Sequence, residues 1–196
     1  GKSLVGTPYR NTSESLLGIE WKAIGKILAQ IGAQGIFEKR DTTVKNQWNL
    51  LPAFSWSFDL GKKNRIGIVY RYTCRQPSFN ELYYQQIGNA KLRTEKAHIA
   101  SIRYDLTLPF KKGVSQTMVQ PFYSYVYDKI LAIPTKNLFI WSIQNIGVSD
   151  AFGVEFTELL QKKIKQHTLG MRINYTFQYT QDISDPLSST YRHILS

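Results

Sequence analysis

The sequence predicts an all-β protein, an antiparallel meander of about eight or nine strands. Three observations predict it: hydrophobic and polar residues alternate along several segments, short connections alternate with long ones, and aromatic residues are abundant. The chain of 196 residues holds 12 Tyr, 10 Phe and 4 Trp but only 2 Met. Aromatic side chains fit the half-buried surface of a sheet better than a helix, so this composition favours strands.

The alternation has a period of two residues, which is the period of a β-strand. In chain order, the clearest segments are 26–37, 53–60, 65–72, 102–108 and 171–179. In the second of these, Phe54, Trp56 and Phe58 fall on one face, opposite Ser55, Ser57 and Asp59. Helical spacing gives no comparable run. We therefore expect strands with one apolar face and one largely polar face, and helix only in a turn or two of the loops.

The connections between these segments fall into two kinds. Short basic connections are predicted near 23–26, 61–64, 109–113 and 161–166, and long ones near 38–47, 73–94, 128–144 and 180–190. In an antiparallel meander every second connection emerges at the same edge. One rim of the sheet should therefore carry tight turns and the other large loops, as in outer-membrane barrels. We interpret the lysines of the short connections as solvated turn residues.

A soluble sandwich and a membrane wall both produce alternating strands, so alternation alone does not separate them. No apolar run reaches the roughly 18 to 20 residues of a membrane-spanning helix. The segments are longer than the usual sandwich strand of about 5 to 6 residues, which favours the membrane wall. Aromatic rings suited to a membrane interface lie on the apolar faces, at Trp21, Trp56, Tyr70, Tyr72, Tyr175 and Tyr179.

The composition also bears on partners and chemistry. The net charge of +11 raises the possibility of nucleic-acid binding. The basic residues gather in short connections, however, so we expect no nucleic-acid partner. Cys74 is the sole cysteine, which excludes an intramolecular disulfide or a zinc site with several thiolates. The three histidines, at 98, 167 and 193, accompany no nucleophile motif. We expect no metal, no cofactor and no enzymatic activity.

One segment carries a resemblance to a known family. The string CRQPSFNELYYQQIGNAKLRTEKAHIASIRYDL, residues 74–106, resembles a segment of TonB-dependent outer-membrane receptors that reads roughly F-R-x-P-[ST]-x-N-[ED]-L-Y, then G-N-x-x-L-x-x-E. The matching positions are Arg75, Pro77, Ser78, Asn80, Glu81, Leu82, Tyr83, Gly88, Asn89, Leu92 and Glu95. Segments 126–137, 145–156 and 191–196 are also similar to the family's pattern, with Asn145, Gly147, Gly153, Val154 and Glu155 at matching positions. The resemblance covers about residues 15 to 196.

The resemblance implies that residues 1–196 form part of a large transmembrane β-barrel in the outer membrane of a Gram-negative bacterium. Barrels of this kind have about 22 strands, so the chain would supply only part of the wall. We expect the plug domain and the segment that engages TonB to lie outside this chain, and the C-terminal closing strand to be missing after Ser196. The implied partners are outer-membrane lipid, the rest of the barrel with its plug, and TonB through the missing N-terminal part.

The resemblance further implies the import of a large scarce nutrient: a ferric siderophore, haem or cobalamin. Aromatic and amide residues of the long connections would contact this chelated ligand, at Tyr83, Tyr84, Gln85, Gln86, Asn137, Phe139, Trp141 and Gln144. The alternative is that these side chains only pack the loops together. Asn80, Glu81, Gly88 and Glu95 are expected to fix the transition from loop to strand, the glycine through an unusual backbone angle and the others through hydrogen bonds to local amides.

A soluble protein is the alternative hypothesis. A soluble antiparallel β-sheet module could use its basic turns to hold an acidic partner. That protein would be soluble without detergent, which separates it from a membrane wall.

Overall fold

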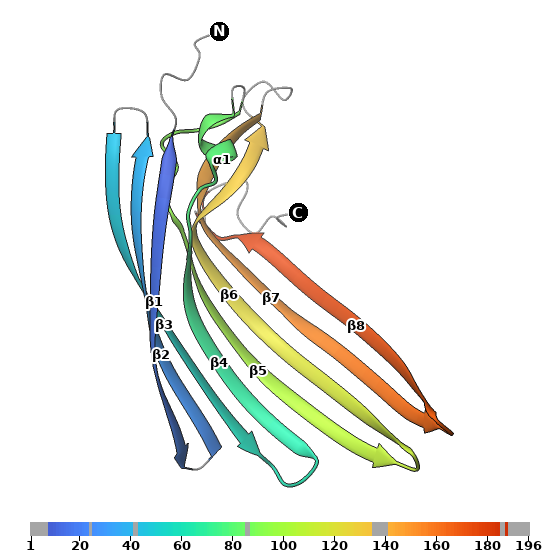
Figure 1. The fold of residues 1–196 in the computed structure, drawn as a ribbon. Coiled ribbons are helices and arrows are strands. Elements are labelled where there is room, and N and C mark those ends of the chain that lie inside the picture. Colours follow the sequence, from blue (N-terminus) through green and yellow to red (C-terminus); the bar gives the residue numbers. More distant parts are fainter. Residues whose placement is uncertain are drawn as a thin grey trace.

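The chain forms a single curved antiparallel sheet (Figure 1). The computed structural model describes residues 8–23, 25–40, 43–84, 87–134, 141–184 and 187. The elements are β1 (Tyr9–Ala23), β2 (Gly25–Arg40), β3 (Thr43–Asp59), β4 (Asn64–Arg75), α1 (Phe79–Tyr83), β5 (Glu95–Phe110), β6 (Gly113–Pro134), β7 (Trp141–Ile164) and β8 (His167–Asp182). The spatial order is β1-β2-β3-β4-β5-β6-β7-β8. The predicted all-β meander of eight or nine strands is confirmed, as is the confinement of helix to a loop.

The strand register places apolar residues of neighbouring strands in rows. Ile27 of β2 pairs with Trp56 of β3, Trp56 pairs with Ile68 of β4, and Ile68 pairs with Ile102 of β5. The next residue along each strand belongs to the opposite face, where Ser57 pairs with Gly67 and Gly67 with Arg103. Because the side-chain period is two residues, each strand has one apolar and one more polar face.

The apolar face is exposed rather than buried. Leu17 and Ile19 of β1 are 70% and 71% exposed, and Leu169 of β8 is 65% exposed. Soluble monomers rarely leave an apolar surface of this extent in water. Within the described residues, the buried hydrophobic cluster is instead a small one, formed by Leu82, Leu92, Ile130 and Ile143 at the end of the sheet that carries α1. The wall therefore needs an apolar environment on one side.

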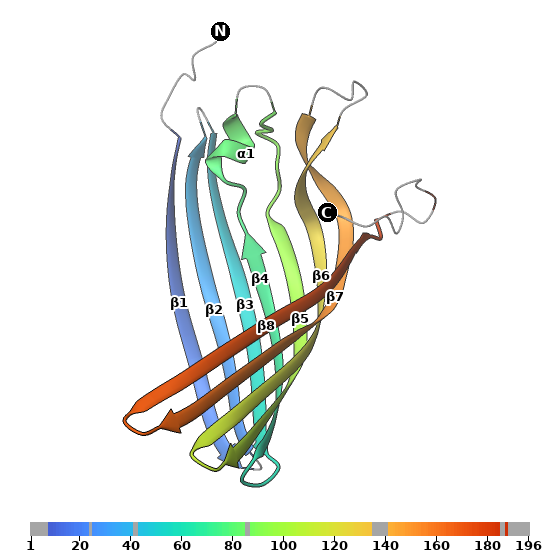
Figure 2. The same cartoon turned by 90° about the vertical axis from the view of Figure 1, so that its right-hand side faces the viewer.

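The two ends of the sheet differ as the connection lengths predict, with two corrections. The tight turns lie at one end, and the long connection containing α1 lies at the other (Figure 2). The prediction of a long connection at 38–47 is wrong. Strand β2 continues to Arg40 and β3 begins at Thr43, and these two residues are paired. The loop expected at 128–144 is also largely strand, since Pro134 pairs with Trp141. Part of the connection expected at 180–190 lies outside the described residues.

Strands β6 and β7 are the longest, with 22 and 24 residues. A membrane β-strand needs only about 9–11 residues to cross the hydrocarbon core. The apolar side chains Phe152, Val154 and Phe156 occupy the middle of β7 on one face. The part of the β6–β7 hairpin beyond Asp128 lies well outside that apolar band and meets the long connection between β4 and β5.

Candidate ligand-binding rim

The connection between β4 and β5, residues 76–94, is called the long loop below. It begins with a capping box that fixes α1. The Ser78 hydroxyl accepts a hydrogen bond from the Glu81 amide at 3.2 Å, and the Glu81 carboxylate accepts one from the Ser78 amide at 2.7 Å. This reciprocal pair satisfies two amides that the first turn of a helix would otherwise leave without partners. Five residues of helix are thereby held at the strand end.

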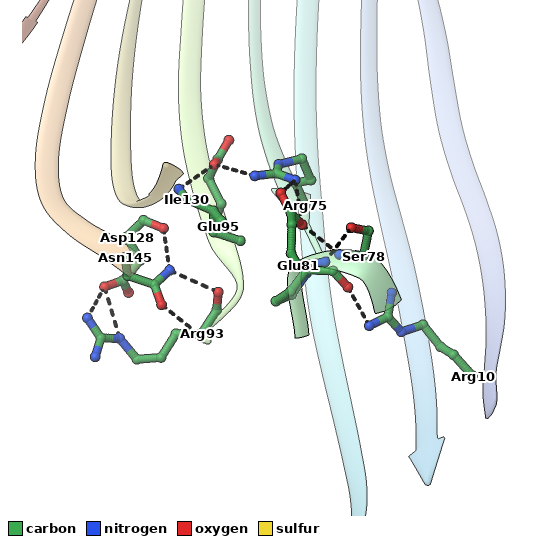
Figure 3. A network of polar contacts seen from close by, with 10 residues as sticks. Arg10, Arg75, Ser78, Glu81, Arg93, Glu95, Asp128, Ile130 and Asn145 are labelled. Atoms are coloured by element: carbon green, nitrogen blue, oxygen red, sulfur yellow. Dashed lines mark hydrogen bonds and ion pairs between the residues drawn. The ribbon is translucent and has the colours of Figure 1, made fainter. Parts of the chain in front are cut away.

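The two ends of the long loop are joined by Arg75 (Figure 3). Its guanidinium donates to Glu81 at 3.0 Å and to Glu95 at 3.1 Å. The same Glu95 oxygen accepts a hydrogen bond from the Ile130 amide of β6 at 3.0 Å. Since charge-assisted hydrogen bonds are roughly twice as strong as neutral ones, this bridge ties the loop entrance, the loop exit and the neighbouring hairpin together.

A second polar cluster fastens the exit of the long loop to the β6–β7 hairpin. The Arg93 guanidinium donates two hydrogen bonds to the Asp128 carboxylate, one of them at 2.9 Å. Asn145 accepts from the Arg93 amide at 2.8 Å and donates to the carbonyls of Arg93 and Asp128 at 3.1 and 2.7 Å. Asp128 has a positive φ of 53°, a conformation that Asp tolerates better than most residues. Arg93, Asp128 and Asn145 are called the latch below.

The buried cluster lies between these two polar groups. Leu82 and Leu92 of the long loop are each 2% exposed and pack with Ile130 and Ile143 of the hairpin. The main chain continues this contact, because the Ile143 amide donates to the Ile87 carbonyl at 3.0 Å. The Asn89 side chain donates to the Ile143 carbonyl, also at 3.0 Å. The long loop and the tip of the β6–β7 hairpin are therefore one packed unit.

The other side of the long loop rests on β1 and β2. Arg10 donates to the Glu38 carboxylate at 3.0 Å and to the Pro77 carbonyl at 2.7 Å. Its guanidinium also lies 5.1 Å from the centre of the Phe79 ring. Glu38 is 1% exposed, and a buried carboxylate needs such a charged partner. Arg10 thus anchors the helix end of the loop to the first hairpin.

Burial and hydrogen bonding shift the pKa of Glu81, in the long loop, in opposite directions. Burial by itself would raise the pKa of Glu81, but the hydrogen bonds from the Ser78 amide and the Arg75 guanidinium outweigh it, so the pKa lies below its ordinary value of 4.5. Hydrogen bonding to Asp128 raises the pKa of Arg93. Both groups are therefore charged at neutral pH.

The predicted ligand-binding residues are not brought into one site among the described residues. Tyr84 is 59% exposed at the end of α1, and Trp141 is 49% exposed at the start of β7. Tyr83 packs against the buried cluster. Gln144 lies on the face of β7 opposite to Trp141, because it is three positions along a strand. Gln85, Gln86, Asn137 and Phe139 lie outside the described residues.

An open groove of about 510 Å³ lies elsewhere, on the polar face near the tight turns. Its walls include Arg65, Arg103 and Arg172 together with Asp59 and Asp105. It contains none of the predicted ligand-binding residues. Within the described part of the chain, no three His, Cys, Asp or Glu side chains gather in a way that could hold a metal ion, and no helix there has the length and apolarity needed to cross a bilayer.

Comparison with known proteins identifies the family. The family model described as "TonB dependent receptor-like, beta-barrel" matches residues 17–196. The chain belongs to the TonB-dependent receptor family. A search of curated proteins gives no match.

Solved structures of TonB-dependent transporters share the fold. The copper transporter OprC superposes with a TM-score of 0.65 at 13% identity, over 90% of this chain and 30% of OprC. The iron transporter FrpB from Neisseria meningitidis (F3-3 variant) gives 0.64 at 13% identity, over 96% of this chain and 28% of FrpB. The siderophore receptor PirA from Pseudomonas aeruginosa gives 0.52 at 14% identity, over 91% and 43%. The chain thus spans less than half the length of each, as part of a barrel wall.

The receptor-family motif residues take several positions around the long loop. Arg75, Glu81 and Glu95 form the bridge, Pro77 accepts from Arg10, and Leu82 and Asn89 contact the hairpin. The roles expected for these residues remain predictions. Asn80 contributes its carbonyl, which accepts from the Tyr84 amide, while no side-chain hydrogen bond of Asn80 is seen within the described ranges.

The prediction that Gly88 is needed for an unusual backbone angle is wrong. Its φ is not in the left-handed region. A Cβ at this position would lie 2.6 Å from the Tyr84 amide nitrogen and 2.7 Å from the Tyr84 carbonyl, so close backbone approach excludes a side chain. Gly153 of β7 is similar, since a Cβ there would lie 2.3 Å from the Phe177 carbonyl. Gly147 lies beside Ser184, and Glu155 pairs with Gln120 and Thr176 in the sheet.

Three residues that position the long loop were not predicted: Arg10, Arg93 and Asp128. Their partners are far away in sequence, with 28 positions between Arg10 and Glu38 and 35 between Arg93 and Asp128. No periodicity links such pairs. Of the three, only Asp128 could have been noticed in the sequence, because the alternation of polar and apolar residues is interrupted there.

Proposed function

We propose that the chain is a wall segment of an outer-membrane active transporter that imports a large scarce nutrient with energy supplied through TonB. The family match over residues 17–196 carries this proposal. The three structural neighbours are a copper transporter, an iron transporter and a siderophore receptor. A ferric siderophore, haem or cobalamin suits the proposed site, because its exposed residues offer flat rings for contact with a bulky chelate.

The same proposal assigns the two faces and the two rims. The apolar face, with Trp56, Ile68 and Ile173, contacts lipid, and the polar face, with Arg71 and Asn174, faces the lumen. The long loop is extracellular and the tight turns are periplasmic. The remaining strands, a plug and the part that engages TonB come from portions of the receptor beyond residues 1–196. A soluble module is disfavoured, since the apolar face is exposed along the sheet.

The proposed contacts to the nutrient are Tyr84 and Trp141, the exposed aromatic residues beside the long loop. Truncating an aromatic residue that contacts ligand typically costs about 1 to 3 kcal/mol, which is roughly a 5- to 150-fold loss of affinity. Tyr84→Ala and Trp141→Ala should therefore weaken binding while leaving the barrel folded, because Tyr84 lies in the long loop and Trp141 is an exposed residue at the very end of β7.

The test uses the intact receptor in detergent. Equilibrium binding is measured with ferric hydroxamate and catecholate siderophores, haemin, cobalamin and Cu²⁺. Lys62→Ala and Lys163→Ala, in the tight turns, are matched controls that should leave affinity unchanged. The heat-resistant electrophoretic mobility of each variant is checked first. If the turn lysines matter more than the aromatic residues, the two rims are assigned the wrong way round.

A further inference from the structure

Lysines gather at every tight turn of the sheet. The β1–β2 turn carries Lys22 and Lys26, the β3–β4 turn Lys62 and Lys63, the β5–β6 turn Lys111 and Lys112, and the β7–β8 turn Lys162, Lys163 and Lys165. These residues are called the lysine rim below. All lie at the end of the sheet opposite α1 (Figures 1 and 2), and all are exposed.

Most of the lysine rim forms no ion pair within the described residues. Lys22 and Lys26 share Glu20, at 3.9 and 3.0 Å. Within the described part of the chain, the lysines of the other three turns make no ion pair. The arginines differ from these lysines, since Arg10, Arg75 and Arg93 at the opposite end are each paired with a carboxylate, as is Arg65 beside the β3–β4 turn. The lysines of these three turns are thus cations whose charges can meet an external anion.

The backbone at two turns gives a second, independent indication. Each tight turn has a residue with positive φ: Gly25 at 85°, Gly61 at 101°, Lys112 at 64° and Lys165 at 54°. Glycine adopts this conformation without the steric cost that a side chain brings. Two lysines therefore occupy positions where glycine would fit the backbone better. This choice favours a use for the charge beyond making the turn soluble.

The neighbouring side chains indicate what the lysines meet. Large apolar residues lie within a few positions of the turns on the lipid face: Trp21 is 64% exposed, Phe110 is 45% and Leu169 is 65%. Exposed rings such as Trp21 and Phe110, each directly followed by a lysine, are typical of a membrane–water interface. Lysine has a long apolar stem and a charged head, so it can extend along the wall and reach the headgroup phosphates. The tight turns keep every lysine near that boundary.

We propose that the lysine rim binds the headgroups of anionic phospholipids in the leaflet on the tight-turn side. The inference rests on the proposed membrane function, because it needs the apolar face to contact lipid. A membrane is favoured over an acidic protein by the spacing of the charges. Successive turns are separated by two strand widths, about 10 Å, along the whole edge. A leaflet offers phosphates along that entire edge, whereas a protein partner would call for one compact patch.

The intact receptor, reconstituted in nanodiscs of zwitterionic phosphatidylcholine with anionic phosphatidylglycerol, tests the inference. Native mass spectrometry then counts the two lipids retained. A lysine near an anionic surface gains about five-fold in affinity, so we expect phosphatidylglycerol to be retained at least about five-fold over phosphatidylcholine. In about 1 M salt the Debye length is about 3 Å, and the preference should disappear.

Two variants of equal charge change locate the site. The first combines Lys62→Gln, Lys63→Gln and Lys111→Gln at the turns, and leaves Lys112 and Lys165 in place because their backbone conformation would confuse the result. The second combines Lys39→Gln, Lys91→Gln and Lys96→Gln at the other end of the sheet. The first variant keeps six of the nine rim lysines, so its preference for phosphatidylglycerol should fall clearly below that of the wild type without being lost. The preference should stay unchanged in the second variant.

Equal lipid retention in the turn variant and the wild type would overturn the inference, as would an equal drop in both variants. Loss of an acidic protein partner from the turn variant, with no lipid preference in the wild type, would also overturn it. Nutrient binding is measured in parallel. Normal nutrient binding without a lipid preference removes the lipid site alone, whereas a receptor that does not enter bilayers overturns the proposed function and the lipid site together.

Discussion

The two ends of the sheet contain the same kinds of charged side chain but use them differently. At the long-loop end, Arg75 bridges Glu81 and Glu95, whose side chains are 23% and 19% exposed. At the tight-turn end, Arg65 pairs with Asp59 while both remain more than half exposed. Partly buried pairs hold structure, whereas exposed pairs contribute little. We infer that tertiary contacts stabilise the long-loop end, whereas the backbone of the turns stabilises the tight-turn end.

The largest effect is expected from the buried cluster. Leu82→Ala leaves a space beside Leu92 and Ile130, so the free energy of opening the long loop should fall by about 2 to 4 kcal/mol. Hydrogen-exchange mass spectrometry of the receptor, reading the amides of residues 87–94, measures this change. Leu60→Ala, at the exposed β3–β4 turn, is the matched control. It should change the free energy of opening that turn by less than about 0.5 kcal/mol. Comparable losses in both variants would contradict the view that tertiary contacts stabilise mainly the long-loop end.

An ion pair at each end gives the next test. Glu95→Ala removes a partner of Arg75 and the acceptor of the Ile130 amide. The free energy of opening the long loop should therefore fall by about 1 to 3 kcal/mol. Asp59→Ala removes an exposed pair, and its effect should stay below about 1 kcal/mol. Guanidinium unfolding of loop and turn, each followed by a local fluorescent label, measures the two. A larger loss from Asp59→Ala would contradict the assignment of order to the long-loop end.

Acid should loosen the long loop. The pKa of Glu81 is lowered in the folded chain, so its charge contributes stability above the ordinary value of 4.5, and this stability is lost as pH falls through the folded pKa. A nitroxide at position 84, with Cys74 replaced by Ser, should become more mobile as pH drops below that value. Glu81→Gln lacks the titrating group and should show a much weaker response. An unchanged response in Glu81→Gln would assign the transition to another group.

The smallest effect concerns a turn backbone. Lys112→Gly should raise stability by about 0.5 to 1 kcal/mol, because relief of left-handed strain exceeds the entropy cost of glycine by a small margin. The midpoint of heat-induced loss of barrel mobility in detergent measures it. Destabilisation would show that the Lys112 side chain makes a stabilising contact within the barrel.

The fold could be predicted where the strands have one exposed apolar face and one polar face. Segments such as 53–60 and 171–179 alternate because one face is apolar and the other polar. Beyond the apolar band the strand ends contact the long loop on one side, as at Glu38 and Ile130, and the alternation disappears. This explains why the ends of β2 and β3, near Arg40 and Thr43, were expected to be loop. It also explains why the hairpin beyond Asp128 was not recognised as strand.

The candidate rim was predictable in part. The family-like string located the long loop, and its residues Arg75, Glu81 and Glu95 do lie together. The latch could not be predicted, because Arg93 and Asn145 are 52 positions apart and meet only when β5, β6 and β7 are side by side. The placement of Trp141 and Gln144 on opposite faces of β7 depends on where the strand begins, which sequence spacing alone does not reveal.

The strand order has a consequence for how the wall is made. Every strand pairs with its neighbour in sequence, so the sheet can grow by adding one hairpin after another. Closing a chain segment costs entropy that rises only with the logarithm of its length. The long loop occupies residues 76–94, against residues 111–112 in the β5–β6 turn. By that relation, joining β4 to β5 costs only about 2 kcal/mol more than joining β5 to β6. The long loop is therefore about 30-fold less favourable to close than the turn, but doubling its length would cost only about 0.6 kcal/mol more, so this rim can carry still longer loops at little further cost.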